Sequence, residues 1–193
     1  DNRDEVVGVK RISKGKDVML MSKKGQAIKF SSDDVRDMGR ASYGVTGIKL
    51  DKSDEVVSLE VLGRGSILTI TEKGYCKRMD IQSYKEQKRG GKGVIGSSLA
   101  TEDFVKQLIT CSTHDYLLFF TSRGRVYWLK ANDVPDAARL SKGRSIANLL
   151  SLRDEEIANV TAVKDFGEDY LMFATKLGIV KRLPLKDLAK PRS

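Results

Sequence analysis

The chain has 193 residues, 40% of them hydrophobic, with 35 Lys and Arg against 26 Asp and Glu and a net charge of +9. That length can bury the core of a single domain, and the positive charge favours an anionic partner. The longest apolar run, residues 116–120, is far too short to cross a bilayer, so we expect no membrane span.

Glycines reveal an internal repeat of roughly 50 residues. Gly25, Gly74, Gly124 and Gly178 follow similar segments at spacings of 49, 50 and 54 residues. An acidic and apolar run that begins at Asp4 returns at Asp54 and, more loosely, twice later. We predict one domain over 1–193, with repeats at about 4–53, 54–101, 102–153 and 154–193, the last of them incomplete.

Each repeat contains an expected β-hairpin, because two runs of apolar, β-branched or aromatic residues flank an X-Gly turn. In chain order the paired runs are 18–21 with 27–30, 67–70 with 75–78, 116–120 with 126–129, and 170–174 with 179–182.

Further runs complete each repeat. One outer run precedes the hairpin, as 56–61 does, and another follows it, as 45–50, 94–99 and 146–150 do. Between the hairpin and the last run lies a polar loop, with a short helical turn expected near Val35, Tyr84, Val134 and Leu188. Four strands in about 50 residues are typical of a propeller blade. We therefore predict an all-β protein of about four blades with four strands each.

The polar loops carry cations in every repeat. One of them holds a glycine-rich basic run, and the candidate contacts are Gln87, Lys88, Arg89, Gly90, Gly91, Lys92 and Gly93. Three glycines allow the backbone to approach a phosphate, while the cations neutralise it. Gly93 has counterparts in Gly44 and Gly143 and can be structural, so Gly90 and Gly91 are the stronger candidates. The other candidate contacts are Arg36, Arg40, Lys85, Arg139, Lys142, Arg144, Lys186, Lys190 and Arg192.

Nothing in the sequence indicates catalysis. His114 is the only histidine and stands beside Asp115 without a serine or cysteine motif, so we expect it in a turn. Cys76 and Cys111 fall within predicted strands, where buried free thiols are expected. No metal-ligand spacing and no phosphate-binding loop of the Walker type occurs. Phe119, Tyr127 and Trp128 lie in predicted strands and are expected to fill the core.

Several motifs resemble one known family. The run Gln87 to Gly93 looks like the GyrA box, the signature of the C-terminal domain of the A-type subunit of DNA gyrase. The strand Gly74 to Arg78, the stretch Ser122 to Leu129 and the stretch Gly44 to Leu50 also resemble blades of that family. The similarity extends over essentially the whole chain.

The resemblance implies a β-pinwheel, a propeller-like disc whose neighbouring blades exchange strands. It implies that double-stranded DNA wraps, without sequence specificity, around a basic rim, and that the box supports negative supercoiling by gyrase. The catalytic residues, ATP and Mg²⁺ would then belong to other domains, so this domain needs no cofactor. The implied partners are DNA, the rest of the A-type polypeptide and the B-type ATPase of gyrase, in a bacterial cytoplasm and nucleoid.

Two features depart from the family pattern. A complete repeat, residues 4–53, precedes the repeat with the box, and Lys88 and Lys92 stand where Arg is common. Two alternatives remain open at this point. One is the C-terminal domain of the topoisomerase IV A-type subunit, whose box is usually degenerate. The other is a propeller that binds proteins, which would not explain cations in register.

Overall fold

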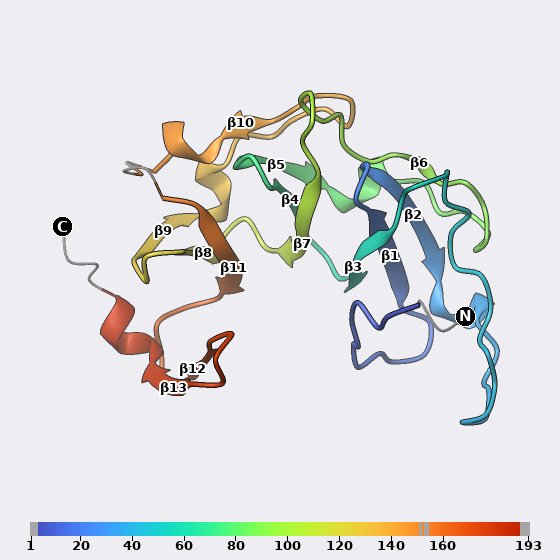
Figure 1. Ribbon diagram of the computed structural model, residues 1–193, viewed down its shortest axis with the longest axis horizontal. Coiled ribbons are helices and arrows are strands. Elements are labelled where there is room, and N and C mark those ends of the chain that lie inside the picture. Colours follow the sequence, from blue (N-terminus) through green and yellow to red (C-terminus); the bar gives the residue numbers. More distant parts are fainter. Residues whose placement is uncertain (1–3, 151, 153–154, 190–193) are drawn as a thin grey trace.

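The computed structural model describes residues 4–150, 152 and 155–189. Four small antiparallel sheets follow one another along an arch, with the first sheet at the right of Figure 1 and the last at the lower left. No α-helix occurs in the described ranges, and the only helical segments there are short 3₁₀ turns. The prediction of an all-β, propeller-like architecture is therefore confirmed.

The expected hairpins form the centre of each sheet. Their turns end in glycines in the left-handed region, with φ values of 85° at Gly25, 76° at Gly74, 76° at Gly124 and 82° at Gly178, which a residue with a Cβ adopts only under strain. The paired strands are β1 (Asp17–Ser22) with β2 (Gln26–Ser31), β4 (Ser66–Thr71) with β5 (Tyr75–Asp80), β8 (Tyr116–Thr121) with β9 (Val126–Lys130), and β12 (Tyr170–Ala174) with β13 (Val180–Pro184).

In the first three sheets the outer strand comes from the following repeat, which corrects the expected pairing. β3 (Val56–Val61) pairs with β1, β7 (Val105–Cys111) with β4, and β11 (Ile157–Val163) with β8. The run that precedes a hairpin in sequence therefore completes the sheet before it. The strand is close in sequence to the later hairpin, but that closeness does not decide the pairing. Without this strand, the apolar face of the earlier hairpin would lack a neighbour.

Of the predicted last strands, only 94–99 forms in part, as β6 (Val94–Ile95), and the prediction of a strand over 146–150 is wrong. A two-residue strand, β10 (Arg144–Ser145), lies just before that run. β6 and β10 pair with β2 and β5, each in the hairpin one repeat earlier. The ladder beyond β6 ends because the Gly96 and Ser97 N–H groups both bend to the carbonyl of Gly25, at 2.7 and 3.1 Å. Beyond β10 the chain turns into a 3₁₀ helix, η4 (Ile146–Asn148). Residues 45–50 form no strand.

The expected helical turns are present after the hairpins. They are 3₁₀ turns, η1 (Ser32–Asp34), η2 (Ile81–Ser83), η3 (Ala131–Asp133) and η5 (Leu185–Leu188). Two of them begin at a side-chain cap, since Ser31 Oγ accepts from the Asp33 N–H and Asp80 Oδ1 from the Gln82 N–H. The first three turns redirect the chain from the hairpin into its long polar loop.

The core lies between successive sheets. Phe119 is fully buried among strands β4, β5, β8 and β11, and Tyr127 packs partly buried against the same cluster. Trp128 packs with Tyr116 and Phe166 at ring-centroid distances of 5.2 and 5.7 Å. These aromatic residues fill the core as predicted. The exchanged strands and this shared core fix how one repeat sits on the next.

Candidate nucleic-acid interface

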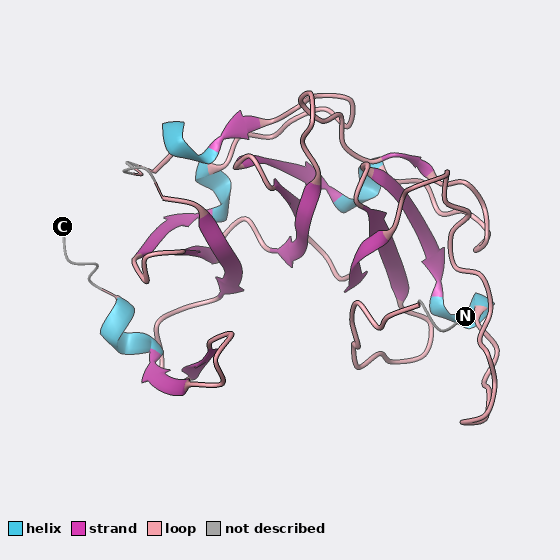
Figure 2. Ribbon diagram, viewed as in Figure 1, coloured by secondary structure: helices cyan, strands magenta, loops and turns pink. Residues whose placement is uncertain are grey.

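The long polar loops lie along the outer edge of the arch. Figure 2 shows them as pink segments that run over the top and down the right-hand side, away from the opening of the arch. Three of them occupy equivalent positions in successive repeats. We call them the first loop (residues 36–44), the box loop (residues 87–93) and the third loop (residues 137–143). Their geometry decides which cations face solvent.

The box loop is anchored at both ends on hairpin β1–β2, which belongs to the preceding repeat. Its first N–H, on Gln87, donates to the carbonyl of Lys29 at 2.8 Å, and its last residue leads into β6 beside β2. The hydroxyl of buried Tyr84 donates to the carbonyl of Gly96 at 2.9 Å, which joins the two flanks of the loop. Burial raises the pKa of Tyr84 to about 12, so this donor stays protonated at ordinary pH. The loop is therefore held as a closed unit.

Two glycines connect the box loop to residues 45–50. The Gly90 N–H donates to the carbonyl of Gly47 at 2.6 Å, and the Lys49 N–H donates to the carbonyl of Gly91 at 2.8 Å. Gly90 has a φ of 78°, in the left-handed region. These bonds explain why residues 45–50 are not a regular strand. They also use the Gly90 N–H, so this group is not available to a phosphate.

A third glycine allows the loop to approach the sheet closely. A Cβ on Gly93 would lie 2.4 Å from the carbonyl oxygen of Ala27, and one on Gly143 would lie 2.3 Å from that of Cys76. The equivalent Gly44 has no atom within 4 Å of its ideal Cβ, although its φ of 80° is of the same kind. Gly93 and Gly143 are therefore required by packing between repeats, whereas Gly44 is required by its φ alone.

One arginine in each of two loops reaches back to the preceding repeat. Arg89 donates from Nε to the carbonyl of Asp34 at 2.8 Å and from Nη1 to that of Thr46 at 3.2 Å. Arg139 donates from Nη1 to the carbonyl of Ile95 at 2.9 Å, which is the same kind of contact one repeat later. Both side chains serve the fold, so only part of each guanidinium remains for an anion.

A buried lysine supports the third loop from beneath. Lys77 on β5 is 1% exposed, and its Nζ donates to the carbonyls of Arg139 at 2.6 Å and Ser141 at 3.1 Å. Burial, and to a lesser extent the nearby charge of Arg139, lowers the pKa of Lys77 from 10.5 to about 8. The box loop has Ile28 at this position, near Gly91. The two loops are thus held by different means.

The remaining predicted cations face solvent. Lys88 and Lys92 of the box loop are exposed, and neither takes part in an ion pair with another described residue. The other exposed predicted cations are Arg36, Arg40, Lys85, Lys142, Arg144 and Lys186, the last of them on η5. Lys190 and Arg192 lie outside the described residues. Apart from Lys186, these exposed cations lie on or directly beside the three loops, which follow one outer edge.

Two relevant lysines escaped the sequence analysis. Lys77 was missed because a cation between strand residues looks solvent-facing, and only its burial reveals its role. Lys49 was missed because residues 45–50 were expected to be a strand, whereas its N–H binds the box loop and its side chain is exposed. A basic residue beside the repeated Gly-x-x-Gly segment was the available signal.

The structure offers little for catalysis within the part it describes. His114 is exposed in a turn, where its N–H lies 3.4 Å from Ser112 Oγ. Burial raises the pKa of Cys76 to about 12 and that of Cys111 to about 11, so neither thiol is a ready nucleophile. No cluster of three potential metal ligands and no helix able to span a membrane occurs among the described residues.

Comparison with known proteins gives a consistent result. The model of the family described as "DNA gyrase C-terminal domain, beta-propeller" matches residues 16–62, 65–112, 115–164 and 169–193. Each of the first three matched units starts at a hairpin and ends with the outer strand that completes its sheet.

A-type subunits of DNA gyrase are among the similar sequences. The Streptomyces coelicolor protein is 48% identical over 129 residues, which is 66% of this chain and 15% of that protein. The Staphylococcus epidermidis protein is 49% identical over 127 residues, which is 64% of this chain and 14% of that protein. The chain therefore spans a small part of the length of these relatives.

Solved structures support the fold. The C-terminal domain of a DNA topoisomerase IV matches with a TM-score of 0.74 at 20% identity, over 93% of this chain and 55% of that chain. A DNA gyrase A C-terminal domain matches with a TM-score of 0.70 at 28% identity, over 78% of this chain and 52% of that chain.

Proposed function

The chain belongs to the DNA gyrase C-terminal domain family, and on that premise we propose that its outer edge binds and bends double-stranded DNA without sequence specificity. The observation that carries the proposal is the placement of unpaired cations, Lys88 and Lys92 above all, on loops that are pinned to that edge. A pinned loop presents its charges without an ordering cost on binding.

The energetics of this function are a balance between bending and phosphate contacts. Smoothly bending a few tens of base pairs by 40–90° costs on the order of 1–6 kcal/mol. Each neutralised phosphate releases counterions and contributes about −0.9 to the slope of log K against log salt. The eight exposed candidate cations would therefore give a slope of roughly −7 if all contacted phosphates. Contacts of this kind position the duplex but do not read its sequence.

The candidate residues divide into three roles under this proposal. Lys85, Lys88, Lys92, Lys142 and Arg144 contact phosphates, as do Arg36, Arg40, Lys186, Lys190 and Arg192 with lower weight. Arg89 and Arg139 hold their loops and contribute charge at short range. Gln87, Gly90, Gly91 and Gly93 shape the box loop through the contacts that the backbone makes with hairpin β1–β2 and residues 45–50.

Within the whole protein, the domain would support the introduction of negative supercoils. We place it in the A-type polypeptide of a bacterial gyrase, which works with an ATP-hydrolysing B-type partner in the cytoplasm. ATP, Mg²⁺ and the strand-cleaving residues would lie in other domains, and this domain would act without a cofactor. The nearly complete box favours this proposal over a topoisomerase IV role, in which wrapping has a different topological outcome.

The test is a ligation or relaxation assay that measures the linking-number change of a closed circular plasmid. We expect the chain to shift the topoisomer distribution, and Lys88→Gln with Lys92→Gln to reduce that shift strongly. Replacing Arg89 as well would confound the result, because this side chain also holds the loop.

A matched control removes the same charge elsewhere. Lys14→Gln with Lys16→Gln alters two exposed lysines of the segment below β1, on the side of the opening of the arch. This control should retain the full linking-number shift. Equal losses in both double variants would mean that net charge alone governs binding, and an unchanged shift in the box variant would contradict the proposal.

A further inference from the structure

Two large apolar side chains are exposed in the middle of the chain, and they lie close to one another. Between residues 45 and 165, as far as the structure describes them, only Ile95 and Leu140 combine a large apolar side chain with high exposure, at 54% and 60%. Ile95 ends β6 of the first sheet, and Leu140 lies in the third loop, which packs on β5 of the second sheet. Both are therefore found where the first two sheets adjoin.

A hydrogen bond joins the two positions. Arg139, directly before Leu140, donates from Nη1 to the carbonyl of Ile95 at 2.9 Å. The two residues are therefore separated by about the length of an arginine side chain. We call Ile95 and Leu140 the apolar pair. It lies between the box loop and the third loop, on the outer edge of the arch (Figure 2).

The backbone that carries the apolar pair is held in place. Ile95 belongs to the ladder of β6 with β2. On either side of Leu140, the carbonyls of Arg139 and Ser141 accept hydrogen bonds from the Nζ of buried Lys77, at 2.6 and 3.1 Å. A side chain on a fixed backbone can be buried by a ligand without the cost of ordering a loop. The apolar pair is thus prepared for contact.

The sequence around the apolar pair is positively charged and free of acids. Residues 87–100 and 137–150 contain no Asp or Glu, and they include the exposed cations Lys92, Lys142 and Arg144. This charge favours a polyanion. A nucleic-acid strand alternates anionic phosphates with sugar rings whose carbon atoms are apolar, and proteins contact both parts of its backbone. A surface that combines cations with apolar side chains matches that alternation.

We propose that the apolar pair packs on deoxyribose rings at the minor groove of the bound duplex, and that this contact makes the edge favour DNA over double-stranded RNA. The inference rests on the proposed function and names what selects its ligand. Cations alone discriminate weakly, because the phosphates of both duplexes carry the same charge. An RNA helix displays 2′-hydroxyls in its minor groove. Burying such a hydroxyl against Ile95 and Leu140 without a hydrogen-bond partner is unfavourable.

An apolar contact differs from a phosphate contact in how it responds to salt. Each neutralised phosphate contributes to the slope of log K against log salt, because counterions are released. Burial of apolar surface releases no counterions, so it changes log K by a similar amount at every salt concentration. Loss of the apolar pair should therefore lower the whole line without tilting it.

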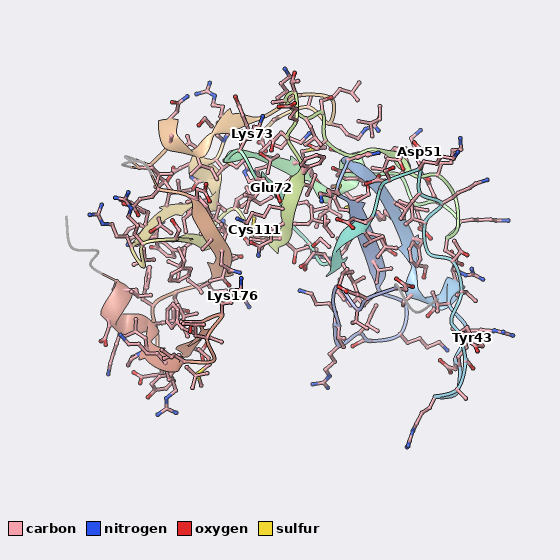
Figure 3. All side chains as sticks on the ribbon, in the orientation of Figure 1. Tyr43, Asp51, Glu72, Lys73, Cys111 and Lys176 are labelled. Atoms are coloured by element: carbon pink, nitrogen blue, oxygen red, sulfur yellow. The ribbon has the colours of Figure 1, made fainter. Side chains whose placement is uncertain are left out.

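Fluorescence anisotropy with a DNA duplex at several salt concentrations tests the first part. Ile95→Thr with Leu140→Ser should weaken binding about five- to tenfold at every salt concentration and leave the slope unchanged. Lys142→Gln should instead reduce the slope by about 1. Leu177→Ser is the matched control, because Leu177 is 89% exposed and follows Lys176 at the opening of the arch (Figures 1 and 3). It should have no effect on DNA binding.

Double-stranded RNA of the same length and base order tests the second part. The wild type should prefer DNA, and Ile95→Thr with Leu140→Ser should lose much of that preference because only its affinity for DNA falls. A preference that came from helix shape alone would persist in the variant and would contradict the proposal.

The remaining outcomes separate this inference from the proposed function. Equal losses on DNA and RNA, a changed salt slope, or a loss that depends on thymine content would overturn the assignment to deoxyribose. Wild-type binding to DNA that the double variant retains in full would show that the apolar pair is ordinary exposed surface, while the proposed function stands. A wild type that binds neither duplex would overturn both.

Discussion

Arg89 shows how a residue in a basic motif can act on the fold rather than on the ligand. Its guanidinium spans two backbone carbonyls of the first repeat, and Arg139 repeats one of these contacts. A planar fork can satisfy two acceptors that diverge, whereas a lysine ammonium is a point charge. The main role of Arg89 is therefore to hold in place the loop that carries Lys88 and Lys92.

We expect Arg89→Lys to loosen the box loop even without DNA. The Gly90 and Lys49 N–H groups, which join the loop to residues 45–50, should exchange with solvent roughly tenfold faster because their partners are no longer held in place. Hydrogen exchange followed by NMR measures this directly. Lys88→Gln is the control and should leave both rates unchanged. Equal exchange rates in the wild type, Arg89→Lys and Lys88→Gln would show that Arg89 does not hold the loop in place.

We expect the buried Lys77, below the third loop, to make the free energy of unfolding depend on pH. Its pKa is lowered from 10.5 to about 8, so between these values the unfolded chain binds the proton and the folded chain does not. The free energy of unfolding contributed by this group therefore rises with pH in that window. Relative to Lys77→Met, the wild type should gain roughly 2 kcal/mol between pH 7.5 and 10.

Urea unfolding of both proteins at the two pH values measures this difference, and the subtraction removes titrations that they share. Lys77→Arg is a useful companion, because an arginine keeps its charge throughout the range. A difference between wild type and Lys77→Met that does not change with pH would show that the ammonium is not desolvated in the folded protein.

At the scale of elements, three equivalent glycines allow two contributions to stability to be compared. One is the left-handed backbone conformation, and the other is close packing against a neighbouring hairpin. Gly44, Gly93 and Gly143 hold the same place in three loops and have φ values of 80°, 71° and 80°. Only the latter two lie against the backbone of a preceding hairpin. The three positions therefore share the left-handed φ and differ in whether the glycine packs closely against a hairpin.

We expect Gly93→Ala and Gly143→Ala to destabilise the chain more than Gly44→Ala does. The left-handed φ alone costs on the order of 1 kcal/mol for a residue with a Cβ. The Cβ at position 93 or 143 must also displace a carbonyl, which adds strain of roughly 1–3 kcal/mol. Thermal unfolding monitored by circular dichroism compares the three. Equal losses would mean that φ, and not the approach of the loop to the hairpin, explains the repeated glycine.

The sequence predicted hairpins well because their information is local. An X-Gly turn between apolar runs specifies β4 and β5 without reference to the rest of the chain. It could not predict that β3 pairs with β1, since a strand that lies between two hairpins has the same apolar pattern whichever of them it joins. It also could not predict that residues 45–50 bind the box loop, because two backbone hydrogen bonds leave no mark in hydrophobic periodicity.

The candidate site was predictable as a set of charges but not as a set of roles. Repeated basic positions pointed to the loops, and the resemblance to a family pointed to the box. Burial and hydrogen bonding then distinguish Arg89, Arg139 and Lys77 from Lys88 and Lys92, which the sequence alone presents as equivalent cations. Contact with a phosphate by any of them stays a prediction.

At the scale of the whole molecule, the arch determines whether separate loops act on one duplex. The box loop and the third loop are carried by adjacent sheets along the same outer edge (Figure 2). A duplex that follows this edge contacts both loops, but only if it is long enough. A very short duplex instead occupies one loop at a time.

We therefore expect the effect of the third loop to depend on the length of DNA. With a duplex of about 40 base pairs, Lys142→Gln in the third loop together with Arg144→Gln, which lies directly after it in β10, should reduce the slope of log K against log salt by about 2. A similar loss is expected from Lys88→Gln with Lys92→Gln. With about 10 base pairs, the Lys142 and Arg144 pair should have little effect while the box loop is intact. Fluorescence anisotropy at several salt concentrations measures both slopes. Effects of equal size on both lengths would mean that the loops bind separate duplexes, and that bending along the edge is not how this chain holds DNA.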